Sequence, residues 1–156
     1  MAILKIVEVG DPLLRKVSRP VEEITPRVLT LLDDMTETMR KHDGCGLAAV
    51  QVGVLRRIVV IEVDDVLYEL INPRIVAKAG NQEECEGCLS LPKTWGITRR
   101  PRAVTVRALN RKGEEVEYTG RDLLARAFCH EIDHLDGHLF TDVMIRRLRP
   151  DEVEEG

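Results

Sequence analysis

Two stretches of the chain repeat apolar residues at three- and four-residue spacing, which predicts two long helices. In residues 26–42 the repeating positions form one apolar stripe: Val28, Leu31, Leu32, Met35 and Met39. Pro26 is typical of a helix start, and Gly44 is typical of the turn that follows a helix end. The second pattern covers residues 121–136 and ends before Gly137. We therefore expect an N-terminal helix and a later helix, each with one buried face.

Between and after these helices the pattern is that of short, β-branched strands. The expected strands are residues 57–63, 66–71, 74–77, 103–109 and 115–118. Asn72-Pro73 is expected to break the chain between two of them, and residues 110–113 predict a hairpin turn. Two helices with several antiparallel-looking strands predict an α+β fold. No repeat or linker divides the chain, so we expect one domain over residues 1–156 with a short charged tail at about 146–156.

The composition limits the classes of function. The chain has 156 residues and a formal net charge of −4, with a pI near 5.6. Without a broad basic surface, it is not expected to bind nucleic acid or an anionic membrane. No stretch approaches the roughly 20 apolar residues that a membrane-spanning helix needs. Four cysteines without a secretory signal indicate reduced thiols or metal ligands in a cytoplasmic protein. Composition alone does not separate an enzyme from a binding module.

The strongest chemical signal is the sequence His130-Glu-Ile-Asp-His134 on the second expected helix. Residues four apart lie on one face of a helix, so both imidazoles can bind one metal ion. Glu131 is rotated by about 100° from His130, which suits a carboxylate that takes a proton from metal-bound water better than it suits a ligand. These residues lie among apolar core positions, where their burial is costly unless they are paired or bind a metal.

A catalytic metal site needs a third protein ligand and an open position. Cys88 is the candidate, because a thiolate and two imidazoles make a site that can activate water. His138 lies beyond Gly137, after the expected helix end, and is a weaker candidate. Two alternatives stay open: a zincin-type peptidase with a downstream ligand, and a non-catalytic zinc module that uses Cys85 as well as Cys88. The remaining thiols are expected to be buried or half-buried: Cys45, Cys85 and Cys129.

The glycine-rich segment Gly44-Cys-Gly-Leu-Ala-Ala-Val-Gln51 fits the loose form of a dinucleotide-binding motif. That motif follows a strand and begins a helix, whereas this segment follows a helix and precedes a strand. A nucleotide cofactor is therefore not expected. The small residues instead allow the backbone to approach another group closely. Gln51 is a candidate donor to an oxyanion, although a solvated glutamine is the commoner case.

Three segments together are similar to the motifs of the peptide deformylase family. They are residues 44–51 (G-x-G-L-A-A-x-Q), 86–90 (E-G-C-L-S) and 130–134 (H-E-x-x-H), in the family's order. The segment Gly10-Asp-Pro-Leu-Leu-Arg15 also resembles that family. The resemblance covers nearly the whole chain. It implies an α+β fold in which antiparallel sheets pack around a central helix that carries the H-E-x-x-H motif.

The resemblance also implies a reaction and the residues that perform it. The reaction is removal of the formyl group from the N-terminal formylmethionine of newly made polypeptides, with release of formate. The family's metal ligands map onto Cys88, His130 and His134. Metal-bound water would attack the formyl carbon with Glu131 as general base and acid. Gln51 and the backbone N–H of Leu89 would stabilise the oxyanion.

Further expectations concern the substrate, the metal and the partners. The substrate-binding positions map onto Gly44, Cys45, Gly46, Glu86, Gly87, Leu123 and Ala127. Asp133 and Arg100 are candidates for holding the imidazoles in place. The family implies one divalent metal per chain, usually Fe(II), with zinc, nickel or cobalt as alternatives. Nascent formyl-Met peptides are the expected partners, with transient ribosome contact, and the chain is expected to be a monomer. If exposed, Cys45 would make the enzyme sensitive to oxidation or alkylation.

Overall fold

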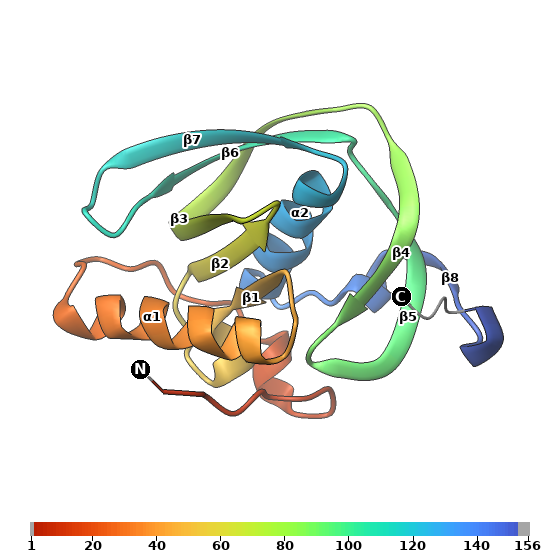
Figure 1. Cartoon of the computed structure of the whole chain (residues 1–156), viewed down its shortest axis with the longest axis horizontal. Helices are drawn as coiled ribbons and strands as arrows, with labels where there is room; N and C mark the ends of the chain where they lie inside the picture. Colours follow the sequence, from red (N-terminus) through yellow and green to blue (C-terminus); the bar gives the residue numbers. More distant parts are fainter. Residues whose placement is uncertain (1, 153–156) are drawn as a thin grey trace.

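The computed structural model describes residues 2–152, which form two antiparallel sheets and two α-helices (Figure 1). The helices are α1 (Pro26–Lys41) and α2 (Leu123–Leu135). The strands are β1 (Gly46–Ala48), β2 (Ile58–Val63), β3 (Val66–Ala79), β4 (Gln82–Cys88), β5 (Leu91–Arg100), β6 (Ala103–Leu109), β7 (Glu115–Arg121) and β8 (Met144–Arg147). Short 3-10 helices are η1 (Pro12–Arg15), η2 (Ala49–Val52), η3 (Phe140–Asp142) and η4 (Pro150–Glu152). The predicted α+β class is confirmed.

The larger sheet has the strand order β1-β2-β3-β6-β7 and separates two apolar cores. Side chains alternate across a strand, so Val59 and Ile61 of β2 pack in the core under α2, while Ile58 and Val60 pack in the core under α1. Figure 1 shows α2 in the middle of the molecule, with the larger sheet on one side and β4 and β5 on the other. The central position of α2 places its histidines between the two sheets.

Helix α1 forms where the apolar stripe predicts it, and it ends one residue earlier than expected. The Thr25 hydroxyl accepts a hydrogen bond from the Val28 N–H, which caps the first turn. The stripe packs on the larger sheet through three fully buried side chains: Leu32, Met35 and Met39. At the other end the Gly44 N–H donates to the Met39 carbonyl, so the chain turns directly into β1. Neither α-helix in the described part of the chain has the length and apolar character to cross a membrane.

The predicted break at Asn72-Pro73 is wrong, because β3 continues through it. Asn72 has a φ of 52°, and the pairing of β3 with β6 shifts between Ile71 and Arg74. The Asn72 side chain accepts a hydrogen bond from the Val21 N–H at 2.8 Å and donates one to the Val21 carbonyl at 2.9 Å. These bonds to a neighbouring loop stabilise a bulge where the local sequence predicts an end.

The smaller sheet has the strand order β4-β5-β8 and was not predicted. Strand β4, with the sequence Gln82-Glu-Glu-Cys-Glu-Gly-Cys88, contains few residues that favour strands. Its buried side chains are polar, namely Gln82 and Glu86, so no alternation of apolar residues marks it. The charged tail expected from residue 146 begins within β8, and its residues 153–156 lie outside the described part of the chain.

Candidate metal centre and active site

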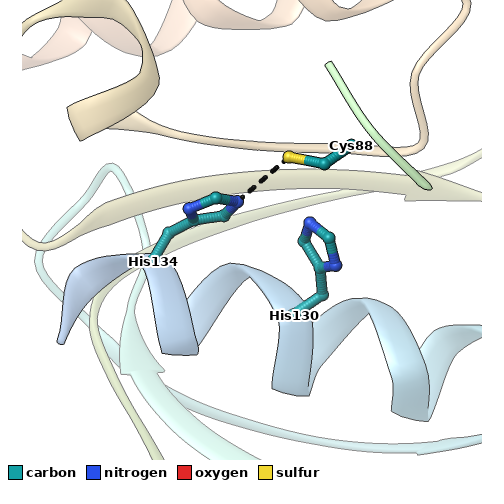
Figure 2. Close-up of side chains that lie close together, drawn as sticks. All are labelled: Cys88, His130 and His134. Atoms are coloured by element: carbon teal, nitrogen blue, oxygen red, sulfur yellow. Dashed lines mark hydrogen bonds between the residues drawn. The ribbon is translucent and has the colours of Figure 1, made fainter. Parts of the chain in front are cut away.

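Three potential ligands from two elements converge beside α2 (Figure 2). His130 and His134 are four residues apart on α2 and both are buried, while Cys88 comes from the end of β4. One donor atom from each of the three lies within 4.8 Å of the others. The Cys88 Sγ and His134 Nε2 atoms are 3.3 Å apart. The β4 strand thus supplies a third potential ligand beside the two on α2.

The chemistry of these residues fits a divalent metal. A thiolate and two neutral imidazoles suit zinc, iron, nickel and cobalt. The buried Glu131 Oε1 atom has no hydrogen-bond partner among the described residues, which is costly for a polar atom in an apolar setting. His138 does not belong to this group, since its exposed ring points to Asp142. Cys85 is exposed and does not belong to it either, so the group has three potential protein ligands among the described residues.

A buried ion pair holds His130 in place. Glu86 accepts from His130 Nδ1 at 2.9 Å and from two nitrogens of Arg100 at 2.9 and 3.1 Å, and Thr98 also donates to it. Burial acts to raise the pKa of Glu86, but the bonds from His130 and Arg100 outweigh it and lower the pKa to about 2. Arg100 also donates to Asp133 at 2.7 Å. The residues therefore form a chain from Asp133 through Arg100 and Glu86 to the imidazole.

This chain changes two expectations. Glu86 was expected among the substrate-binding positions, and it does line the cavity, but its carboxylate is turned to His130 and Arg100. Arg100 and Asp133 were expected to hold the imidazoles, and they are one step further away, because Glu86 lies between Arg100 and the ring. A hydrogen bond at Nδ1 holds the imidazole ring and leaves its Nε2 atom free to bind a metal ion.

Glu131 lies beside the ligands and against β1. Its side chain is 4% exposed, and burial raises its pKa to about 7. A carboxyl group with this pKa can both take and give a proton near neutral pH. A methyl group on Gly46 would lie 2.5 Å from Glu131 Oε2. A side chain at position 46 would therefore force the Glu131 carboxylate out of its place.

The glycine-rich segment brings Gln51 to the same site. Gln51 is 1% exposed, and its Oε1 accepts from the Ala48 N–H at 2.9 Å. This bond orients Nε2 toward Ser90 Oγ at 3.1 Å and Cys88 Sγ at 3.4 Å. Leu89 lies in the turn after Cys88, and its side chain packs against Gly44. The amide of Gln51 and the turn at Leu89 therefore flank the same ligand.

A cavity of about 740 Å³ opens over these groups. Its walls include all the expected substrate-binding positions: Gly44, Cys45, Gly46, Glu86, Gly87, Leu123 and Ala127. Cys45 and Cys85 also line it and are exposed, which corrects the expectation that these thiols are buried or half-buried, whereas Cys129 is buried as expected.

Several wall residues carry no motif and were missed. Trp95 lies on β5 against Gly87, where an added methyl group would be 2.8 Å from the indole, and Lys93 precedes it. Arg126 lies three residues after Leu123 and four before His130. The helical period that relates the two histidines also places Arg126 on the same face, so the sequence contained that signal.

Comparisons with known proteins agree with this geometry. The model of the polypeptide deformylase family matches residues 3–149. The peptide deformylase of Acetivibrio thermocellus is 58% identical over 154 residues, which cover 99% of this chain and 91% of that protein. That of Caldanaerobacter subterraneus subsp. tengcongensis is 56% identical over 154 residues, with 99% and 97% coverage.

Solved structures are also similar. The peptide deformylase of Thermotoga maritima superimposes with a TM-score of 0.90 at 36% identity and covers 92% of this chain and 99% of that one. The Ehrlichia chaffeensis deformylase in complex with actinonin has a TM-score of 0.90 at 39% identity, with 92% and 90% coverage. The family match spans most of the chain, and the chain covers 90% or more of each of these relatives. The chain therefore belongs to the peptide deformylase family.

Proposed function

We propose that this chain is a peptide deformylase, which removes the formyl group from the N-terminal formylmethionine of newly made polypeptides. The observation that carries the proposal is a cavity in which Cys88, His130, His134 and a buried Glu131 meet, in a chain 58% identical to a named peptide deformylase. The reaction adds water across an amide. The C–N bond breaks, the amine takes a proton, and formate leaves.

The metal would be held by the three convergent ligands: Cys88, His130 and His134. When bound, a divalent ion lowers the pKa of water and polarises the formyl oxygen. We propose Fe(II) as the native ion, with zinc, nickel or cobalt as substitutes, because a thiolate with two imidazoles accepts all of them. Glu86 keeps its carboxylate on His130 and so fixes which ring nitrogen faces the ligand side.

The proton transfers fall to Glu131. Its carboxylate is buried beside the ligands, and it would take the proton from the attacking water and deliver it to the leaving amine. Gln51 Nε2 and the backbone N–H of Leu89 flank Cys88 and would donate hydrogen bonds to the oxyanion that develops on the formyl oxygen. The two donors come from separate segments, so the packing of β1 and η2 against β4 assembles the site.

The peptide would lie between two sheet edges. Strand β1 is an edge strand of the larger sheet, and β4 is an edge strand of the smaller one. Residues of both edges line the cavity: Gly44, Cys45 and Gly46 near β1, and Gly87 on β4. An extended peptide can add to such edges through its backbone, which binds many sequences alike. Leu123 and Ala127 on α2 would then form the wall for the first side chain.

The test is formate release from formyl-Met-Ala-Ser by protein prepared without oxygen and loaded with Fe(II). We expect rapid release by the parent and loss of activity in Glu131→Gln, with metal content retained. Actinonin, which the Ehrlichia chaffeensis structure contains, should inhibit the reaction. No formate release by protein that holds one metal per chain would reject the proposal.

Two variants address the remaining alternatives. Cys88→Ala should abolish metal binding, whereas a zincin-type peptidase with a downstream ligand would keep its metal. Cys85→Ala should keep both metal and activity, whereas a structural zinc module built on both cysteines would lose its metal. We also propose action in the cytoplasm, as a monomer with transient ribosome contact, because nascent chains are the substrate.

A further inference from the structure

Several charged side chains in the cavity wall take no part in metal binding or proton transfer, and Arg126 is the one that lies on the helix with the two histidines. Arg126 lies on α2 one turn before His130, and it lines the cavity together with Leu123 and Ala127. Positions three, four and seven apart share one face of a helix. The face that carries the metal ligands therefore also presents a guanidinium to the cavity. A cation is unexpected in a pocket that receives an apolar methionine side chain.

The position of Arg126 is fixed by Gln82. Arg126 Nη1 donates to Gln82 Oε1 at 2.7 Å. Gln82 is 5% exposed, and its Nε2 group donates to the carbonyls of Pro101 and Asp122, both at 2.9 Å. Both ends of the amide are thus occupied, and a flipped amide would lose three hydrogen bonds. Arg126 is therefore held in one orientation by a buried anchor.

The remaining donors of Arg126 are free for a ligand. A guanidinium has five N–H groups, and Arg126 forms no ion pair with a carboxylate among residues 2–152. It is half-buried. Partial loss of water around the Cys45 and Cys85 thiols is the main cause that raises their pKa, and the charge of Arg126 acts to lower both. Both thiols line the cavity, so the charge is felt inside it.

The distance from the metal ligands suits the end of the first side chain. Arg126 precedes His130 by four residues, which is about 6 Å along the helix axis. A methionine side chain spans four bonds from Cα to its methyl group, about 5 Å when extended. With the formyl group at the ligands, an extended first side chain that runs along α2 is therefore long enough to reach the turn that carries Arg126. The next side chain of an extended peptide points to the opposite side, away from this wall.

We propose that Arg126 makes this enzyme accept N-formylmethionine sulfoxide at the start of a new chain. This inference rests on the proposed function and names a second substrate for the same site. Oxidation turns the thioether into a polar, chiral sulfoxide, whose burial in an apolar pocket is costly. A guanidinium donates a charge-assisted hydrogen bond to the sulfoxide oxygen, while a thioether sulfur is only a weak acceptor.

The test compares three substrates on the full chain loaded with Fe(II): formyl-Met-Ala-Ser, its methionine sulfoxide form, and its norleucine form, which has no acceptor. The readout is the ratio of kcat/KM for the sulfoxide to kcat/KM for norleucine. We expect Arg126→Leu to lower this ratio roughly tenfold or more, as loss of a charge-assisted hydrogen bond predicts. Arg121→Leu is the matched control, because Arg121 is exposed at the end of β7 and is not among the cavity residues. It should keep the parent ratio.

A second readout needs no catalysis. Trp95 lines the cavity and is the single tryptophan of the chain, so its fluorescence reports binding of the product peptides. Arg126→Leu should weaken binding of the sulfoxide product more than it weakens binding of Met-Ala-Ser. Because Gln82 fixes the guanidinium, the parent should distinguish the two sulfoxide epimers, and the variant should lose that preference. Arg126→Gln, which keeps a polar link to Gln82, is a second variant with the same expected direction.

The outcomes separate this inference from the proposed function. Cleavage of formyl-Met-Ala-Ser with an unchanged sulfoxide-to-norleucine ratio in both Arg126 variants would overturn the inference alone. A parent that rejects the sulfoxide peptide as strongly as its Arg126 variants do would also overturn it. Absence of formate from every peptide would instead overturn the proposed function.

Discussion

The buried arginine that supports the metal site allows a quantitative prediction. Replacing Arg100 with methionine keeps much of its volume but removes three charge-assisted hydrogen bonds, two to Glu86 and one to Asp133. Arg100 is 6% exposed, so Glu86 would be left as a buried carboxylate paired only with His130 and Thr98. Water cannot easily replace the lost partner. Breaking a buried ion pair by removing one member typically costs about 3–5 kcal/mol.

The pKa of Glu86 provides a second estimate of this cost. The pKa of this carboxyl group falls from its ordinary value of 4.5 to about 2 on folding, because the bonds from His130 and Arg100 outweigh burial. One pKa unit corresponds to about 1.4 kcal/mol, so the shift stabilises the folded state by roughly 3 kcal/mol. A lowered carboxyl pKa contributes its full stabilisation at every pH above the ordinary pKa, so the whole contribution is present at pH 7. Part of this stabilisation of Glu86 comes from His130, whereas the bond to Asp133 adds to the stabilisation that Arg100 provides. We therefore expect Arg100→Met to lower the free energy of unfolding by about 3 kcal/mol.

Urea unfolding at pH 7 measures this loss, and an exposed pair with similar geometry serves as control. Arg107 donates to Glu117 at 2.7 Å, with both side chains about half exposed. Such surface pairs contribute about 0–1 kcal/mol, so Arg107→Met should change stability little. Arg100→Met should also weaken metal binding about 10- to 100-fold, because the carboxylate that orients His130 is released. Equal, small losses in both variants would refute the reasoning.

Three further predictions use close contacts and thiol chemistry. Gly46→Ala should reduce kcat at least about tenfold, because the added methyl group lies 2.5 Å from Glu131 Oε2 and a misplaced catalytic group costs this much or more. Gly137→Ala should lower Tm by several degrees, since Gly137 has a φ of +79° and its Cβ would meet a backbone carbonyl at 2.5 Å. Iodoacetamide at pH 8 should label the exposed Cys45 and spare Cys129, whose pKa burial raises to about 11, with labelling of Cys129 appearing only as the pH approaches that value.

Each of these predictions has a control. For Gly46→Ala, the metal content and urea midpoint should stay near those of the parent, and full activity would show that Glu131 does not need this space. For Gly137→Ala, a glycine with open space around it, such as Gly53→Ala, isolates the effect of positive φ, and equal losses would exclude the clash as the cause. For the thiols, peptide mapping identifies the labelled cysteine, and early labelling of Cys129 would contradict its burial.

The residues on α2 that we propose for metal binding and proton transfer were accessible from the sequence because helical spacing alone relates them. His130, Glu131 and His134 lie within one helix, where a period of 3.6 residues determines their mutual directions whatever the surroundings. The apolar stripe of α1 and the hairpin of β6 and β7 depend on equally local patterns. The order of the three motifs along the chain indicates the family, and the family comparison agrees with it.

Only the tertiary structure decided how the supporting residues are arranged. The partner of His130 is Glu86, 44 positions away, and the anchor of Arg126 is Gln82, also 44 positions away. The Glu86 carboxyl and the Gln82 amide both come from β4. The buried side of this strand is polar, so no alternation of apolar residues predicts it. Local spacing specifies directions within one element, whereas the pairing of a buried charge depends on which elements pack together. For that reason the ligands on α2 could be predicted from the chain, and the network that orients them could not.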